Sequence, residues 1–305
     1  MPSLERSFFL DKTTFAPGRR SSPGWLADAS CSDQSCTVGW FHRLRMKSLR
    51  RPVFEDAWSC SDRCLRAKVA TAFRRESTEG GVRRTHQHRL PIGLILLEQK
   101  VITQEQLQDV LRAQKSTGGG RIGDWLMKVC GVEEAQITRA LARQWSCPVF
   151  PLAEFDPETI ARTAPLRILE RSAAVPLRLI GTERLQVGFE HAISAAATFA
   201  IERTNRIRVE SGLAVKSELR AVQRMLCKDD FIPETFHACS ELAEVRERVV
   251  RCLSQLQPVA SRLSRVHEFY WLRMWLEDGA LVQGRAGFPQ SLVDVCDHVF
   301  TSPDC

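Results

Sequence analysis

The chain has 305 residues, 44% of them hydrophobic, and a net charge of +7, which is typical of two or three globular domains. It contains no stretch of about 18 uncharged apolar residues, and its first apolar run, Phe8 to Leu10, is shorter than the core of a signal peptide. The sequence therefore predicts neither a membrane span nor a secretion signal, and we expect a cytoplasmic protein.

The positive charge lies at the N-terminal end, where residues 1–90 carry 17 Lys and Arg against 9 Asp and Glu. Residues 1–28 mix Pro, Gly, Ser and Arg without hydrophobic periodicity, which predicts a disordered basic arm. Such an arm either solubilises the chain or attracts nucleic acid, anionic lipid or acidic protein. Near Trp40 and Phe41, the residues that would face nucleic-acid phosphates are Arg43, Arg45, Lys47, Arg50 and Arg51.

Residues 29–76 contain a cluster of four cysteines, Cys31, Cys36, Cys60 and Cys64. The eleven cysteines of the chain are an odd number, which argues against a disulfide framework. Two short-spaced thiolate pairs can supply the four corners of a zinc tetrahedron, with His42 as an alternative ligand; free buried cysteines are the other interpretation. Residues 58–64, WSCSDRC, resemble the second half of TRASH-like and treble-clef zinc knuckles, and this resemblance implies a structural zinc ion.

After a predicted polar linker at residues 77–88, residues 89–150 contain one helical pattern written twice. A shift of 30 residues aligns Ile92 with Ile122, Gly93 with Gly123, Leu96 with Leu126, Leu107 with Ile137, Leu111 with Leu141 and Gln114 with Gln144. Each copy predicts a short helix, a tight turn and a second helix. Thr103 and Gln106 form a predicted capping box for the second helix of the first copy.

Residues 151–228 predict a small α/β subdomain. Asp156-Pro157 is typical of a helix start. The predicted strands are Ala174–Ile180, Leu185–Phe189 and a strand near Ile207–Val209. The predicted helices are Ala192–Glu202 and Ser217–Leu226.

Residues 229–305 are a predicted extension of helices and a hairpin. A long helix is expected from Pro233 to Leu256, with a second helical stretch after Pro258. The expected hairpin joins the aromatic strand Phe269–Leu276, a predicted sheet core, to Ala280–Val282 across Asp278-Gly279. The fold class is therefore α+β and multi-domain, with tandem helical hairpins, a small α/β domain and an N-terminal segment resembling a zinc knuckle.

The doubled motif resembles the MshEN domain, the N-terminal domain of type II secretion and type IV pilus assembly ATPases, and the resemblance extends to about Leu226. It implies binding of cyclic di-GMP, a two-fold symmetric dianion of which each hairpin would hold one half. The ligand-binding residues that it implies are Ile92, Gly93, Leu96, Leu97, Leu107, Leu111, Gln114, Arg121, Ile122, Gly123, Leu126, Met127, Ile137, Leu141 and Gln144.

The first copy departs from the family motif at two positions. Pro91 stands where the motif has Arg, and Lys100 stands where it has the Gly of the helix turn. In the second copy the Arg is present as Arg121, and the turn Gly is displaced by one residue, at Cys130-Gly131. We therefore expect a well-formed half-site around Arg121 and Gln144, while the competence of the first half-site stays open.

Sequence motifs of common enzymes are missing. The chain has no GxxxxGK[ST] loop, GxSxG elbow, HExxH helix or EF-hand loop, and no nucleophile with a paired acid and base is visible. Our hypothesis is a non-enzymatic regulatory protein that binds cyclic di-GMP and acts on secretion or pilus machinery, the partner that the resemblance implies. The alternatives are a protein–protein adaptor that has lost nucleotide binding, which Pro91 and Lys100 would explain, and a zinc-dependent nucleic-acid-binding protein.

Overall fold

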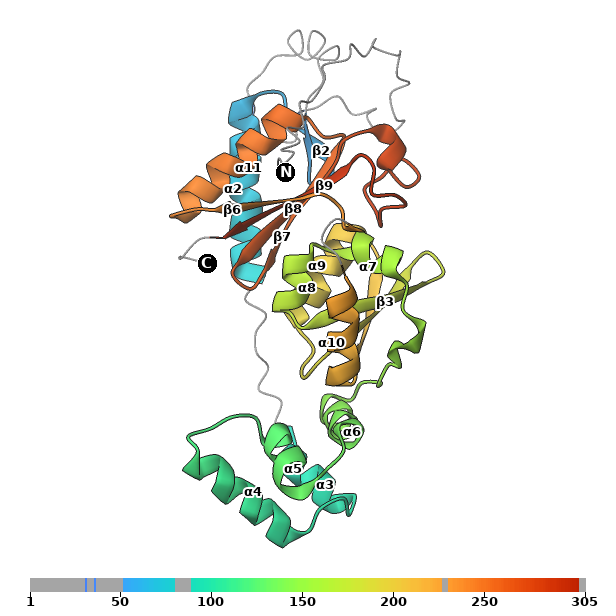
Figure 1. The fold of residues 1–305 in the computed structure, drawn as a ribbon. Helices are drawn as coiled ribbons and strands as arrows, with labels where there is room; N and C mark the ends of the chain where they lie inside the picture. Colours follow the sequence, from blue (N-terminus) through green and yellow to red (C-terminus); the bar gives the residue numbers. More distant parts are fainter. Residues whose placement is uncertain (1–30, 32–35, 37–51, 80–88, 227–229, 302–305) are drawn as a thin grey trace, which may run out of the picture. The chain divides into compact units, whose positions relative to one another are not determined.

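A computed structural model gives the fold of the chain (Figure 1) and describes residues 31, 36, 52–79, 89–226 and 230–301. Helices and several small sheets follow one another along the chain, which confirms the predicted α+β class. No helix among the described residues is long and apolar enough to cross a membrane. The residues predicted to form the basic arm, the nucleic-acid strip and most of the linker lie outside the described part of the chain, as does His42.

The doubled pattern forms two helical hairpins, as predicted. Their helices are α3 (Ile92–Glu98), α4 (Gln104–Ser116), α5 (Ile122–Cys130) and α6 (Glu134–Trp145). The predicted capping box is present at α4, where Thr103 Oγ1 accepts from the Gln106 backbone N–H at 3.2 Å and Gln106 Oε1 accepts from the Thr103 N–H at 2.8 Å. Glu133 and Gln136 form the repeat-related box at α6, which the sequence analysis missed.

The two hairpins interlock rather than stand side by side. Helix α3 packs against α6, and α4 packs against α5, so each hairpin contributes a helix to both layers. Their shared core is formed by Ile92, Ile95, Leu96, Ile102, Val110, Leu126, Val132, Ile137 and Ala140. This exchange explains why a repeat is needed, because the apolar face of one hairpin is covered only by the other.

The α/β subdomain has the predicted order of strands and helices. Its elements are η2 (Leu152–Glu154), α7 (Pro157–Thr163), α8 (Leu166–Arg171), β3 (Ala174–Ile180), β4 (Arg184–Phe189), α9 (Ala195–Asn205), β5 (Arg208–Leu213) and α10 (Lys216–Met225). The sheet has the order β3-β4-β5, antiparallel then parallel. The Asp156 side chain caps α7 by accepting from the Glu158 N–H at 3.1 Å, as its position before Pro157 predicted.

The C-terminal residues form a four-stranded sheet of order β6-β9-β8-β7, and one helix of the same segment packs on one of its faces. Its elements are β6 (Glu234–Ala238), α11 (Leu242–Leu256), β7 (Ala260–Val266), β8 (Phe269–Trp275), the 3-10 turn η4 (Asp278–Ala280) and β9 (Val295–Thr301). Three predictions were wrong. The first part of the expected long helix is the strand β6, the expected second helix is the strand β7, and the expected strand Ala280–Val282 begins in η4.

The error at β7 has a physical reason. Leu263 and Val266 are spaced as on a helix face, but the polar residues around them are buried and bonded in a strand. Ser261 Oγ donates to the Val53 carbonyl at 2.8 Å, and Ser264 Oγ lies 3.0 Å from Thr204 Oγ1. A strand whose buried side chains include hydrogen-bonded polar ones lacks the alternation of polar and apolar residues from which strands are predicted. The error at β6 arises because its pairing partner, β9, lies about sixty residues away in the sequence.

The sheet is buried on both faces, as the aromatic run in β8 predicted. On one face Tyr270, Leu272 and Met274 join a core with α11 and with helix α2 (Asp62–Glu79), and β1 (Val53–Phe54), paired with β2 (Ala57–Trp58), adds to this core. On the other face Trp271 packs into the core of the α/β subdomain. Segments near the two ends of the described chain therefore share one core, with α2 and α11 side by side in Figure 1.

Candidate functional site

Two glutamines tie the hairpins together at repeat-related positions. Gln114 Nε2 donates to the Gly120 carbonyl at 2.7 Å, at the start of the second copy, and Gln144 Nε2 donates to the Leu90 carbonyl at 2.5 Å, at the start of the first. Because Gly120 and Leu90 are themselves 30 residues apart, the bonds are reciprocal. Each glutamine positions the backbone step that precedes the Ile-Gly pair of the other hairpin.

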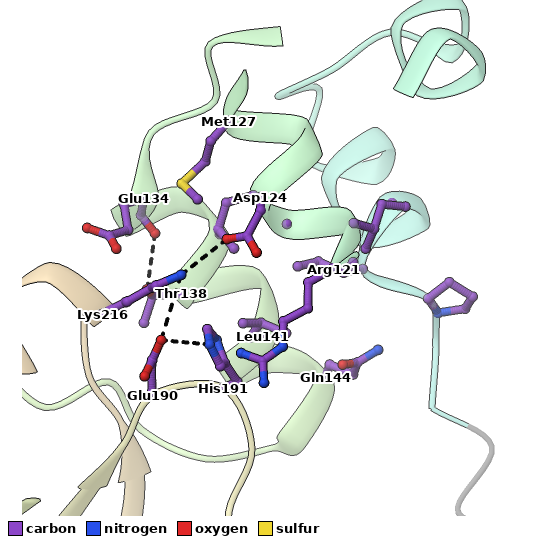
Figure 2. A pocket seen from close by; sticks show the side chains of 16 residues that line it. Arg121, Asp124, Met127, Glu134, Thr138, Leu141, Gln144, Glu190, His191 and Lys216 are labelled. Atoms are coloured by element: carbon purple, nitrogen blue, oxygen red, sulfur yellow. Dashed lines mark hydrogen bonds and ion pairs between the residues drawn. The ribbon is translucent and has the colours of Figure 1, made fainter. Parts of the chain in front are cut away.

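A cavity of about 400 Å³ opens where α3, α5 and α6 meet (Figure 2). The two Ile-Gly pairs, Ile92-Gly93 and Ile122-Gly123, both line it, and Met127, Ile137 and Leu141 extend its apolar lining. The volume falls within the range of about 300 to 1,000 Å³ that small-molecule sites have. The cavity is therefore a mainly apolar bed built from both copies of the repeat.

The α/β subdomain supplies one wall of the cavity through Glu190, His191 and Lys216. Lys216 Nζ lies 3.3 Å from Asp124 Oδ1 on α5 and 3.8 Å from Glu190 Oε1 (Figure 2). Glu134 at the start of α6 accepts from the Ser217 backbone N–H at 3.1 Å, so it satisfies an otherwise unbonded donor of α10. These contacts connect the hairpins directly to the first turn of α10.

The charged groups of the cavity differ in whether they are paired. Glu190 is buried, and its Oε1 lies 3.2 Å from the Arg220 guanidinium and 2.7 Å from His191 Nε2. The carboxylates of Asp124 and Glu134 also have partners. Within the part of the chain that the structure describes, no hydrogen bond or ion pair engages the Arg121 guanidinium, which is exposed at the cavity. Arg121 is thus a cation available to an anionic ligand.

The structure brings together nine of the residues that the resemblance implied. Those that line the cavity are Ile92, Gly93, Arg121, Ile122, Gly123, Met127, Ile137, Leu141 and Gln144. Leu96 and Leu126 are fully buried between the helices, Leu97 and Leu107 are partly buried against the same core, and Leu111 is 45% exposed. The cavity therefore gathers Arg121 and Gln144 with both Ile-Gly pairs, while Leu96, Leu97, Leu107, Leu111 and Leu126 lie outside it.

The repeated glycine has a packing role. A Cβ at Gly93 would lie 2.7 Å from Leu107 Cδ1, and one at Gly123 would lie 3.1 Å from Ile137 Cγ2. Both atoms belong to the second helix of the same hairpin. The glycine therefore leaves room for a side chain from the second helix of the same hairpin.

Six cavity residues were missed by the sequence analysis, namely Asp124, Glu134, Thr138, Glu190, His191 and Lys216. Glu134 and Thr138 precede Leu141 at helical spacing on the cavity face of α6, so periodicity could have identified them. Glu190 follows β4, and Lys216 begins α10. Nothing local in the sequence indicated that these two would face the hairpins.

No protein-family model matches. The type IV pilus assembly ATPase PilB of Myxococcus xanthus (strain DK1622) is 31% identical over 91 residues, which are 30% of this chain and 16% of PilB. The structure of MshE with cyclic di-GMP is 27% identical, and the match covers 45% of this chain and 98% of that one, with a TM-score of 0.38.

A structure of the N-terminal domain of XpsE is 20% identical, with coverage of 44% of this chain and 91% of that one and a TM-score of 0.33. The resemblance predicted from the doubled motif is confirmed by the match to PilB. The chain carries an MshEN-like domain. The match covers 16% of PilB, so this chain spans only a small part of the length of that ATPase.

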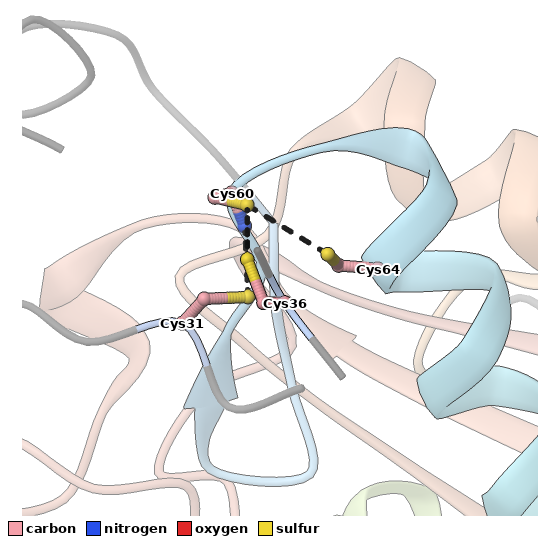
Figure 3. Close-up of side chains that lie close together, drawn as sticks. All are labelled: Cys31, Cys36, Cys60 and Cys64. Carbon is pink, nitrogen blue, oxygen red and sulfur yellow. Dashed lines mark hydrogen bonds between the residues drawn. The ribbon is translucent and has the colours of Figure 1, made fainter. Parts of the chain in front are cut away.

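The four clustered cysteines converge on one point, at the end of β2 and the start of α2 (Figure 3). Their sulfur atoms all lie within 4.8 Å of one another. Cys60 Sγ is 3.4 Å from Cys36 Sγ and 3.7 Å from Cys64 Sγ, far longer than the roughly 2.05 Å of a disulfide. In a zinc tetrahedron with bonds of about 2.3 Å the sulfur atoms are about 3.8 Å apart. The spacing therefore fits four thiolates around one zinc ion.

The protonation state of this cluster depends on whether a cation is bound. Burial raises the pKa of the Cys60 thiol, and its contact with Cys36 raises it further. Four thiolates placed this close would repel one another strongly in the absence of positive charge. A bound divalent cation reverses this balance because it stabilises the deprotonated form.

Proposed function

We propose that the MshEN-like domain binds cyclic di-GMP in the cavity between the hairpins and that the protein is a non-enzymatic regulator. The observation that carries the proposal is the unpaired, exposed Arg121 guanidinium beside an apolar bed to which both copies of the repeat contribute. A cyclic dinucleotide needs both features, since its bases have apolar faces and its phosphates are anionic. The similarity to MshE, which was solved with cyclic di-GMP, supports the same ligand.

The remaining cavity residues have consistent roles in this proposal. Arg121 pairs with a phosphate or stacks on a guanine, for which its planar, permanently charged guanidinium is suited. Ile122, Ile137 and Leu141 contact the bases. Gln144 keeps its amide nitrogen on the Leu90 carbonyl and offers its amide oxygen as an acceptor. The carboxylates that would repel a dianion are already engaged by Lys216, Arg220 and Ser217.

Ligand binding is coupled to the α/β subdomain in this proposal. Lys216 bridges Asp124 on the hairpins and Glu190 next to β4, and a phosphate entering the cavity competes for the same ammonium group. A ligand that takes Lys216 from Asp124 weakens the contact between α5 and α10. We propose that this change is what a partner in secretion or pilus machinery detects, in line with the likeness to PilB.

Isothermal titration of the purified chain with cyclic di-GMP tests the ligand. Removing a charge-assisted contact costs about 1.5 to 3 kcal/mol, so Arg121→Ala should raise Kd roughly 10- to 150-fold. Arg139→Ala is the matched control, since Arg139 is exposed on α6 and does not line the cavity. Absence of binding heat at tens of micromolar ligand would contradict the proposal and favour the adaptor function. Equal Kd values for Arg121→Ala and wild type would contradict binding of the ligand at Arg121.

We further propose that Cys31, Cys36, Cys60 and Cys64 hold a structural zinc ion. The sulfur spacings and the position of Cys60 and Cys64 at a strand end and a helix start support this assignment. The ion would fix the β1-β2 hairpin on α2, a segment too small to supply a core of its own.

A further inference from the structure

Three further side chains with metal-binding atoms meet between α11 and the four-stranded sheet. His237 comes from the edge strand β6, His298 from β9 and Cys252 from α11. Their ligand atoms all lie within 4.8 Å of one another. We propose that His237, Cys252 and His298 form a second transition-metal site, distinct from the four cysteines and from the nucleotide cavity.

The distances within this triad fit a single bound ion. His237 Nε2 lies 2.9 Å from His298 Nδ1, and Cys252 Sγ lies 3.6 Å from the same Nδ1. With bonds of about 2.05 Å to nitrogen and about 2.3 Å to sulfur, tetrahedral coordination places two nitrogen ligands about 3.3 Å apart and a nitrogen and a sulfur about 3.6 Å apart. The distance from Cys252 Sγ to His298 Nδ1 matches this value. The two histidine nitrogens would have to move apart by about 0.4 Å to reach theirs.

The fold holds the three side chains in place. Cys252 and His298 are buried, with exposed fractions of 9% each, while His237 on the edge strand is only partly buried and leaves a route from solvent. The two imidazole rings are nearly parallel, at an angle of 8°, and the Phe300 ring stacks on His237 with centroids 4.6 Å apart. All three candidate ligands stand on regular elements, whose packing limits their side-chain rotation.

The triad also has a simpler interpretation, in which one neutral histidine donates a hydrogen bond to the other. That bond would leave the Cys252 thiol without a role, although Cys252 Sγ points to the same nitrogen atom as His237 Nε2. A shared ion would use all three atoms, because Cys252 Sγ and both ring nitrogens would then be its ligands. The two interpretations therefore differ in whether Cys252 is needed.

The donor set selects the class of metal. Two imidazoles and one thiolate suit zinc and neighbouring late transition metals, whereas magnesium and calcium require oxygen ligands. Three protein ligands leave a fourth position for water or for an external donor. Since His237 borders solvent, we assign that open position to the outer edge of the sheet.

Counting metal ions in the full chain tests the proposal. The protein is stripped of metal under reducing conditions, titrated with zinc or cobalt(II), and analysed for bound metal after dialysis. The wild type should hold one ion more than His237→Ala and one more than Cys252→Ser. His267→Ala is the matched control, because His267 lies in the β7-β8 turn of the same sheet and outside the triad. Cobalt spectra should lose a band from a single thiolate in Cys252→Ser.

A second variant distinguishes metal bound by the triad from metal bound by the four cysteines. In Cys60→Ser/Cys64→Ser the His237-dependent ion should remain, and circular dichroism shows whether each variant is folded. Equal metal counts in folded wild type and folded His237→Ala overturn the proposal. If His237→Ala does not fold, the count in Cys252→Ser decides in the same way. None of these measurements uses cyclic di-GMP, so the outcome is independent of the nucleotide proposal.

Discussion

Replacing Asp297 should strongly lower the free energy of unfolding, because Asp297 neutralises a buried arginine that links the C-terminal sheet to the α/β subdomain. Asp297 on β9 and Arg273 on β8 are both 0% exposed, and the guanidinium donates to both carboxylate oxygens, at 2.8 and 2.7 Å. Trp271 Nε1 donates to the same carboxylate at 2.8 Å. Arg273 also donates to Asn205 Oδ1 at 2.7 Å and to the Arg162 carbonyl at 2.8 Å, both in the α/β subdomain.

The expected cost follows from what Asp297→Ala leaves behind. The Arg273 guanidinium keeps its bonds to Asn205 and to the backbone of α7 but loses the carboxylate that neutralises it, and the Trp271 N–H loses its acceptor. Removing one partner of a buried ion pair costs about 3 to 5 kcal/mol because the other charge stays buried. This is a large share of the roughly 5 to 15 kcal/mol that stabilises a typical domain.

Urea denaturation followed by circular dichroism measures this loss. The midpoint should fall strongly in Asp297→Ala at an unchanged slope, whereas Glu247→Ala should leave it nearly unchanged. Glu247 also pairs with an arginine, Arg66, but both of these side chains are more than half exposed. Equal midpoints for the two variants would refute the reasoning that burial, rather than ion pairing itself, determines the contribution.

Two further outcomes are expected. Lys100→Gly should stabilise the chain by about 0.5 to 1 kcal/mol, because Lys100 has a φ of 56°, which costs a residue with a Cβ more than the extra entropy of glycine. The melting temperature of Lys100→Gly should therefore rise, and that of the control Gln99→Gly, where φ is −76°, should fall. A fall in both variants would contradict this prediction. A zinc chelator in reducing buffer should lower the melting temperature, and Cys60→Ser but not Cys130→Ser should reduce that response. A melting temperature insensitive to chelator would exclude structural zinc.

Local chemistry in the sequence was sufficient for the hairpins and for much of the α/β subdomain. The 30-residue repeat, the Thr103 cap and the Asp156-Pro157 helix start depend on contacts within a few residues, so their patterns predict structure directly. The same holds for the spacing of the four cysteines, which predicted a cluster that the structure brings together. One copy of the motif likewise indicated Arg121 and Gln144, which the structure places at the same cavity.

Tertiary structure alone decided the rest, because the deciding contacts join residues far apart in the chain. Residues 234–266 contain two strands where helices were expected, since their partners β8 and β9 pair with them only in the folded sheet. Lys216 and Glu190 enter the cavity through packing of the subdomain on the hairpins. His237, Cys252 and His298 are isolated residues in the sequence, and only the register of β6 on β9 under α11 brings their side chains together.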